Sequence, residues 1–240
     1  MSAREKQPAF EEGSAIVSHM KSSQEVRSGF GCVRPLSLAT ALTTLAGFLD
    51  ATAFIALDHL YVSFMSGNST QLGISLTLGN LRDTLSIAVV IIAFVLGAVC
   101  GTRISDNGNN APIVCSLATE TAFRLAAMIL ALAHQTEASL VLVAAAMGLQ
   151  NCLHQLVGGA DVGKGFITGA LFSFGQSLAR FGDGISQWRT AGSNLLSWLA
   201  FVVGAVSGAV ALDRIGITAC VGAACLFAFA VLAAVRFRLL

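Results

Sequence analysis

A carboxylate and a group of small polar residues lie in the first half of a chain that is otherwise strongly apolar. Asp50 falls inside the apolar run 36–57, and Ser66, Gly67 and Asn68 follow near the start of the next run. A charged side chain near the centre of a bilayer costs about 2.5–3.5 kcal/mol on insertion scales, and such residues are usually functional. Asp50 is therefore a candidate for handling a solute or a proton. The alternative is a structural role, as an ion-pair partner or as the cap of a broken helix.

The sequence Ser66-Gly67-Asn68 favours the start of a short helix. The exposed N–H groups and the dipole at such a start attract an anion or a polar oxygen. The same residue types also let membrane helices approach closely and hydrogen-bond to one another, so binding and packing both remain open. Gln71, one turn further on, shares a helix face with Gly67 and Asn68.

Glu120 and Arg124 lie near the centre of a later apolar run, four residues apart. With Glu on the N-terminal side, this spacing favours an ion pair within one helix. A pairing of Arg124 with Asp50 across the bundle is the alternative.

The composition identifies a polytopic membrane protein. Of 240 residues, 55% are apolar and 11% are charged, against about 25% charged in a soluble domain, and the mean hydropathy is +0.76. Because backbone polar groups must be paired inside lipid, the spanning segments are expected to be helices, giving an all-α fold in contact with the bilayer. Eight segments are predicted, at about 36–57, 61–79, 84–102, 111–133, 138–157, 165–181, 192–212 and 215–236.

The first 35 residues differ from the rest of the chain, because they contain nine of its 27 charged residues. They are predicted to form a flexible cytoplasmic tail. Residues 36–236 are predicted to form a single transmembrane domain.

Comparison of the two halves indicates a tandem duplication, with repeat 1 at about 36–133 and repeat 2 at about 138–236. Gly47-Phe48-Leu49-Asp50 aligns with Gly148-Leu149-Gln150-Asn151 at an offset of 101 residues, and Phe64 to Asn68 aligns with Phe166 to Ala170 at an offset of 102. A solute site is expected where the repeats meet, because repeated transporters bind there. Its predicted residues are Asp50, Ser66, Gly67, Asn68, Gln71, Asn151, Thr168 and Gly169.

A third aligned block contains two pairs of glycines four residues apart. Gly97 and Gly101 correspond to Gly204 and Gly208 at an offset of 107 residues. Small residues at this spacing predict close helix packing in both repeats.

The number of crossings depends on the second and sixth segments. If all eight segments cross, ten Lys/Arg lie on the inner side and three on the outer side; if those two are re-entrant, the counts are eleven and two (Arg82 and Arg214). Both arrangements place the two termini in the cytoplasm, by the positive-inside tendency. Six crossings would invert the second repeat relative to the first, whereas eight would leave the repeats parallel.

Several classes of function lack support in the sequence. A net charge of +1 argues against a nucleic-acid partner. The six cysteines form no C-x-x-C pair and are interpreted as small buried residues. The motifs of metalloproteases, serine hydrolases and phosphate-binding loops are absent, and so are histidines at metal-ligand spacing, so neither an enzyme nor a metal or other cofactor is expected.

The run Gly47 to Ala51, the run Val62 to Asn68, and the later Gly148 to Asn151 with Thr168-Gly169 resemble the YoaK family of bacterial inner-membrane proteins, a domain of unknown function. The resemblance covers about 36–236. It implies a bacterial inner-membrane location and about six spans, and it suggests small-molecule transport. The chain departs from a symmetric pattern at Ala170, which aligns with Asn68.

The sequence predicts a bacterial inner-membrane transporter or channel for a small polar or ionic solute. A homo-oligomer is compatible with this prediction. The alternative is a membrane scaffold or accessory subunit, in which the polar residues only specify helix packing.

Overall fold

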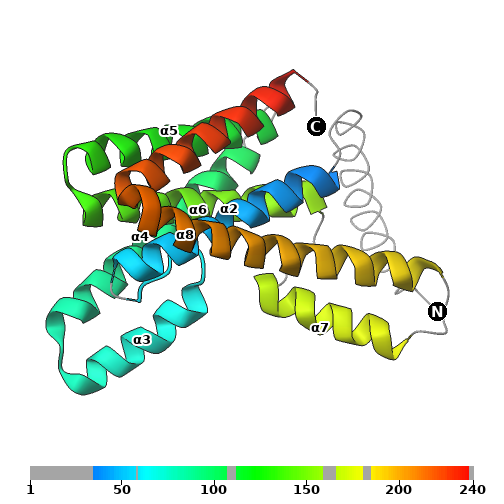
Figure 1. Cartoon of the computed structure of the whole chain (residues 1–240), viewed down its shortest axis with the longest axis horizontal. Coiled ribbons are helices and arrows are strands. Elements are labelled where there is room, and N and C mark those ends of the chain that lie inside the picture. Colours follow the sequence, from blue (N-terminus) through cyan, green and yellow to red (C-terminus); the bar gives the residue numbers. More distant parts are fainter. Residues whose placement is uncertain (1–34, 58, 107–111, 159–165, 181–184, 238–240) are drawn as a thin grey trace, which may run out of the picture.

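The computed structural model describes residues 35–57, 59–106, 112–158, 166–180 and 185–237, so the predicted tail lies almost wholly outside the described residues. All regular elements within these ranges are helices, which confirms the all-α prediction (Figure 1). They are α2 (Pro35–Ala56), α3 (Met65–Leu78), α4 (Leu81–Asp106), α5 (Pro112–Leu132), α6 (Thr136–Gly158), α7 (Phe166–Ala179) and α8 (Ile185–Arg236).

Five of these helices are long and apolar enough to cross a membrane: α2, α4, α5, α6 and α8. The shortest of them, α5, has 21 residues and is therefore about 32 Å long, against a hydrocarbon thickness of about 30 Å. On α4, the large apolar side chains of Val89, Ile92 and Leu96 are exposed, as expected where a helix faces lipid. The chain is therefore a multi-pass membrane protein in contact with the bilayer.

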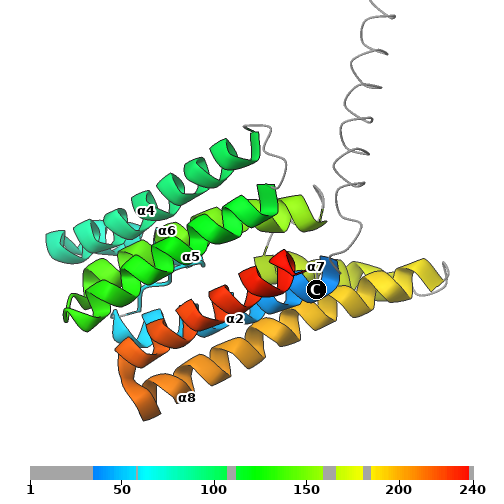
Figure 2. The same cartoon turned by 90° about the horizontal axis from the view of Figure 1, so that it is seen from above.

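Helix α8 holds the last two predicted segments. It contains 52 residues, and its helical backbone is interrupted at Gly216, which has φ 76° and ψ 170°. Because side-chain-bearing residues rarely adopt that conformation, glycine permits the sharp turn there. The turn divides α8 into arms 185–215 and 217–236, and the chain runs back along the bundle after it (Figure 2). The count of eight separate segments is not confirmed.

Helices α3 and α7 are different, because each has only 14 residues and so a length of about 21 Å. Followed by colour in Figure 1, α2, α5 and the first arm of α8 run from right to left, whereas α4, α6 and the second arm run from left to right. The start of α2 and the end of α8 therefore lie at the same end of the bundle. This arrangement corresponds to the alternative in which α3 and α7 do not cross.

Glycines bring two pairs of helices into close contact. A Cβ atom added at Gly97 of α4 would overlap the carbonyl oxygen of Ala145 of α6, and one added at Gly148 of α6 would overlap that of Phe94 of α4. The same relation joins α8 to α2, where Gly204 lies against Thr44. The helices α4 and α6, and α2 and α8, are thus in backbone contact, as packing at small residues requires.

The cross-wise arrangement of these contacts agrees with the predicted alignment of the halves. Gly47 on α2 and Gly148 on α6 are aligned residues in the two halves. Gly47 packs against α8, which carries the glycine pair of the second half. Gly148 packs against α4, which carries the glycine pair of the first half. A duplicated chain with interlocked halves would have these contacts, but the duplication itself stays a prediction.

The positions of Arg103 and Arg214 provide a test of the crossing number. Arg103 lies in the last turn of α4 and Arg214 beside the turn of α8, at opposite ends of the bundle. Arg103→Cys and Arg214→Cys, each in a background without other cysteines, should be labelled by a membrane-impermeant thiol reagent from opposite sides of the membrane. Labelling of both from one side would require eight crossings and would contradict the fold.

The glycine contacts predict that the same substitution, Gly to Ala, changes the free energy of unfolding differently at two positions. Gly97→Ala should lower the free energy of unfolding by about 1–3 kcal/mol, because the added methyl group overpacks the contact with α6. Gly73→Ala, on α3 with nothing within 4 Å of the added atom, should be neutral or stabilising by up to about 1 kcal/mol. Both are measured by unfolding titrations with denaturing detergent. Equal effects of the two substitutions would show that the α4–α6 contact is looser than described.

Candidate functional site

The carboxylate of Asp50 is buried in the bundle, with 2% of the residue exposed. Its Oδ1 accepts hydrogen bonds from the backbone N–H groups of Val62 (2.9 Å) and Ser63 (2.7 Å). Its Oδ2 accepts a third, from the Ser63 hydroxyl, at 2.5 Å. Both carboxylate oxygens are thus engaged by one short piece of chain that follows α2.

These bonds show how the chain turns back after α2. Asp50 lies six residues before the end of α2 at Ala56, which is about 9 Å along the helix axis. Since Val62 and Ser63 contact Asp50, the chain has returned by about that depth before α3 begins at Met65. Residues 59–64 therefore form a non-helical segment beside the body of α2, and we refer to them as the re-entrant segment.

Asn68 in the first turns of α3 holds the same segment from its other side. Its Oδ1 accepts from the Tyr61 N–H at 2.9 Å, and its Nδ2 donates to the Tyr61 carbonyl at 2.7 Å. Asn68 is fully buried. Buried backbone groups outside regular structure need such partners, so Asp50 and Asn68 together replace the hydrogen bonds that a helix would provide.

The other predicted residues of the first half lie around this segment. Gln71 donates from Nε2 to the carbonyl of His59. Gly67 is partly buried against the rings of Phe64 and Tyr61, which a Cβ atom at this position would meet at 2.6 and 2.8 Å. Ser66 is exposed. The structure thus brings the first-half residues together, with Asp50, Asn68 and Gln71 all bonded to the segment.

The second-half residues lie elsewhere. Asn151 is on α6, and Thr168 and Gly169 are on α7, which lies at the opposite end of the bundle from α3 (Figure 1). The chain just before α7, which aligns with the re-entrant segment, lies outside the described residues. The described residues therefore do not unite the two halves of the predicted site, and binding at these positions stays a prediction.

A groove of about 1020 Å³ adjoins the re-entrant segment. Its walls come from the end of α2, the segment itself, α3, the first half of α4 and the start of α6. Gln71 and Ser75 of α3 and Ser86 of α4 supply polar groups, and apolar residues supply much of the remainder. Arg82 and Glu137, whose nearest charged atoms are 3.9 Å apart, lie at its exposed rim.

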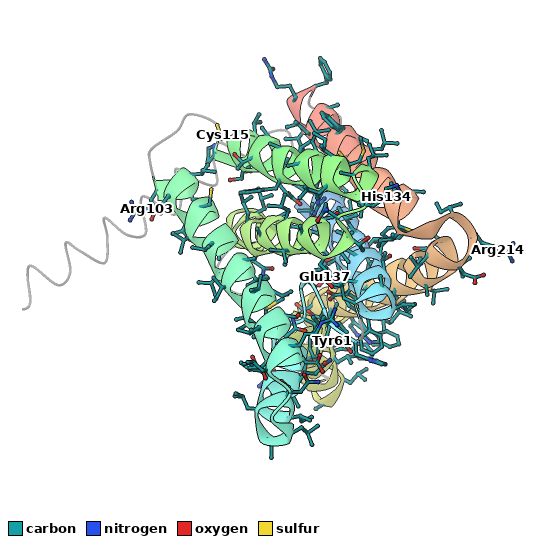
Figure 3. All side chains as sticks on the ribbon, turned by 90° about the vertical axis from the view of Figure 1, so that its left-hand side faces the viewer. Tyr61, Arg103, Cys115, His134, Glu137 and Arg214 are labelled. Atoms are coloured by element: carbon teal, nitrogen blue, oxygen red, sulfur yellow. The ribbon has the colours of Figure 1, made fainter. Side chains whose placement is uncertain are left out.

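The end of the bundle that carries this rim is shown in Figure 3, where Glu137 is labelled at the start of α6 and Tyr61 is labelled below it in the view. His134 and Glu137 mark the turn from α5 into α6, and Arg214 marks the turn of α8. The groove is therefore open at the end of the bundle away from the start of α2.

Glu120 and Arg124 form a second buried polar group. Glu120 Oε1 lies 2.5 Å from Arg124 Nη2, and each side chain is 1% exposed. The same Nη2 donates to Gln150 Oε1 of α6 at 2.7 Å, and Gln150 Nε2 donates to the carbonyl of Leu42 of α2 at 3.1 Å. The ion pair within α5 is thus connected to α6 and α2.

This second group is separate from Asp50. Leu42, the nearest bonded residue on α2, lies eight residues from Asp50, or about 12 Å along the helix. Arg124 pairs with Glu120, and Asp50 bonds to the re-entrant segment.

Ser63 and Gln150, whose side chains bond to Asp50 and to Arg124, were not among the site residues predicted from the sequence. Ser63 directly precedes the aligned Phe64 to Asn68 block, and Gln150 lies inside the aligned Gly148 to Asn151 block. A polar residue inside or beside a repeated block was the available signal in both cases.

The fold and these contacts define an all-α, multi-pass membrane protein with a non-helical segment held inside its bundle. The chain belongs to the family described as "Protein of unknown function (DUF1275)", which it matches over residues 38–234. It is similar to the UPF0700 transmembrane protein RA0705 of Rhizobium meliloti (strain 1021), with 32% identity over 183 residues, covering 75% of this chain and 77% of the relative. No solved structure matches the chain. An uncharacterised membrane family is therefore confirmed.

The Asp50 contacts predict an ordered series of stabilities. Asp50→Ala should lower the free energy of unfolding by about 3 kcal/mol or more, because it leaves two buried N–H groups without an acceptor. Asp50→Asn keeps an acceptor but loses the charge, and should cost about 1–2 kcal/mol. Both effects are measured by detergent unfolding titrations.

Asp213→Ala is the matched control, because Asp213 lies on α8 with a side chain that is 83% exposed. It should change the free energy of unfolding by no more than about 0.5 kcal/mol. An Asp50→Ala protein as stable as this control would show that the carboxylate does not hold the re-entrant segment.

Proposed function

We propose that the protein is a transporter or channel for a small polar or ionic solute, and that the groove beside the re-entrant segment is its entrance from one side of the membrane. The observation that carries the proposal is the non-helical segment 59–64, held beside α2 by the buried carboxylate of Asp50. Non-helical backbone at membrane depth is tolerated where it is buried in protein or lines a cavity, and transporters build their sites from such interrupted helices.

The groove supports this proposal by its position and its lining. It lies directly against the segment, through His59 and Leu60. Gln71 is the predicted binding residue that lines it, together with Ser75 and Asn80. A volume of about 1020 Å³ lies just above the range of about 300–1,000 Å³ usual for small-molecule sites.

In this proposal Asp50 and Asn68 are positioning residues. Their polar atoms bond to Val62, Ser63 and Tyr61, so they fix the wall that the solute passes. Gln71 is the residue proposed to contact the solute. We propose that the solute contacts other residues later, as it moves through the protein. These are Ser66, Gly67, Asn151, Thr168 and Gly169.

The proposal includes an inverted duplication. With α3 and α7 not crossing, α2 and α6 run in opposite directions (Figure 1), and the cross-wise glycine contacts support interlocked halves. An inverted pair of repeats provides two related states, open to opposite sides, without any further element. We propose on the same basis that α7 serves the opposite side.

The remaining features of the proposal come from the sequence. The location is the bacterial inner membrane, with both termini cytoplasmic, because Arg82 and Arg214 are then the two outer basic residues. The proposal also includes three expectations from the sequence. They are the similarity to the YoaK family, a homo-oligomer, and the absence of an enzymatic activity.

A second candidate function is a membrane scaffold or accessory subunit. It is favoured by the number of bonds that Asp50 and Asn68 make within the chain, because a side chain with satisfied polar atoms needs no solute. The scaffold requires no flux.

The two candidates are distinguished by blocking the groove. Ser86→Trp places a large ring in the groove and should lower the flux of a transported solute into proteoliposomes by roughly tenfold, a barrier change of about 1.4 kcal/mol. The screen uses a panel of small polar and ionic solutes. Ser69→Trp is the matched control, because Ser69 is exposed on α3 and does not line the groove.

The transporter predicts that Ser69→Trp retains the flux of the unsubstituted protein. Equal flux in the two variants would place the pathway outside this groove. No flux of any solute by the unsubstituted protein would favour the scaffold.

A further inference from the structure

A column of buried polar side chains lies on one face of α5, formed by Ser116, Glu120 and Arg124 at successive turns. Each residue is at most 1% exposed. Five of their polar atoms have no hydrogen-bond partner within the described residues: Ser116 Oγ, Glu120 Oε1 and Oε2, and Arg124 Nε and Nη1. Of these, Glu120 Oε1 has the ionic contact with Arg124 Nη2. We refer to these three residues as the α5 polar column.

The two buried carboxylates of the bundle are bonded very differently. Asp50 accepts three hydrogen bonds, shared between both of its oxygens. Within the part of the chain that the structure describes, Glu120 has one close partner, Arg124 Nη2 at Oε1, and its Oε2 has none. A buried ionised oxygen without a partner costs free energy, because the protein does not replace the lost hydration. Of the two carboxylates, Glu120 is therefore the one that gains by binding something at its second oxygen.

The chemistry of the column limits what that partner is. Glu120 Oε2 needs a donor, while Arg124 Nε and Nη1 need acceptors. An anion at Arg124 would be repelled by Glu120, and a metal cation at Glu120 would be repelled by Arg124. Water meets both requirements, as buried water does where several polar atoms lack partners, and a proton on Oε2 removes the bare charge.

We propose that Glu120 is a proton-binding site within the membrane, supplied through water held by the α5 polar column. The proton comes from hydronium in the adjoining water and forms an O–H bond at Oε2, releasing a neutral water molecule. Glu120 becomes a neutral acid, and the net charge of the Glu120–Arg124 pair changes from zero to +1. Arg124 keeps its proton and its hydrogen bond to Gln150.

Among the described residues, few competing charges surround the pair. From α8, the thiol of Cys225 lies close enough to interact electrostatically with Arg124. From α6, Gln150 and Met147 contact Arg124, and neither side chain titrates. Helix α2 contributes the Leu42 carbonyl through Gln150, and α4 carries its charged residues in its first and last turns.

Protonation has a structural consequence because Gln150 links three helices. In the ionised state Arg124 is shared between Glu120 and Gln150. When Glu120 is neutral, Gln150 is the remaining strong partner of Arg124, and its second bond runs to α2. The proton therefore changes the balance of bonds between α5 and the α6–α2 pair. This inference does not depend on the proposed transport function.

The test is infrared difference spectroscopy of the full-length protein in lipid nanodiscs over a range of pH. A buried carboxylic acid with few hydrogen bonds absorbs at a higher wavenumber than a solvated one. Such a band should grow as the pH is lowered and should be absent from the Glu120→Gln protein. Glu137→Gln is the matched control, since the Glu137 side chain is 79% exposed, and it should retain the high-wavenumber band.

Because Glu120→Gln leaves the Arg124 charge without its ionic partner, the neutral pair Glu120→Gln with Arg124→Gln is measured as well. Loss of the band in whichever of these proteins is folded supports the site. Persistence of the band in either folded protein overturns it, and so does absence of the band in the unsubstituted protein throughout the pH range in which it stays folded. Since this readout needs no solute, its failure is distinguishable from a failure of the flux experiment.

Discussion

The bonds from Asp50 to the backbone of Val62 and Ser63 are the interaction on which the rest of the arrangement depends. A chain leaving a membrane helix can return into the bundle only if its unpaired N–H and C=O groups find partners there. One carboxylate provides two backbone N–H groups with an acceptor, and Asn68 completes the segment by bonding both backbone groups of Tyr61. The short α3 begins at Met65, directly after this return.

The glycine contacts provide the framework that keeps this segment in place. The contacts of α2 with α8 and of α4 with α6 are close enough that a single added methyl group would overlap backbone atoms. Helices in such contact have little freedom to slide, so the depth of Asp50 on α2 is fixed relative to its neighbours. The groove then lies between the closely packed pair α4 and α6 and the short α3. The main neighbour of α3 is α4.

Much of the fold was predictable, because the apolar segments and the backbone requirement of lipid specify helices directly. The predicted 84–102 and 138–157, for example, lie within α4 and α6. The roles considered for Asp50 included the cap of a broken helix, but its backbone contacts are with the non-helical residues Val62 and Ser63 and not with the first turn of α3. Two of its three bonds were not predictable, since they come from the backbone N–H groups of Val62 and Ser63, and backbone groups carry no signal in the residue types.

The polar network at Arg124 shows the same limit. The spacing of Glu120 and Arg124 predicted their ion pair, because i and i+4 residues are neighbours on any helix. The connection through Gln150 to Leu42 joins three helices, and it depends on their relative depth, which packing sets and local spacing does not. The same reason explains why the predicted site contains residues from α3 and α7, which the sequence aligns but the bundle separates.

The most direct test of the central claim is hydrogen exchange at the individual amides of Val62 and Ser63, in nanodiscs, with and without Asp50→Ala. If the carboxylate holds the re-entrant segment in the bundle, both amides exchange slowly in the unsubstituted protein, at rates comparable with the interior of α4. In the Asp50→Ala protein they then exchange much faster, while the amides of α4 keep their protection. Rapid exchange of both amides in the unsubstituted protein, or slow exchange that survives the loss of the carboxylate, would contradict the account.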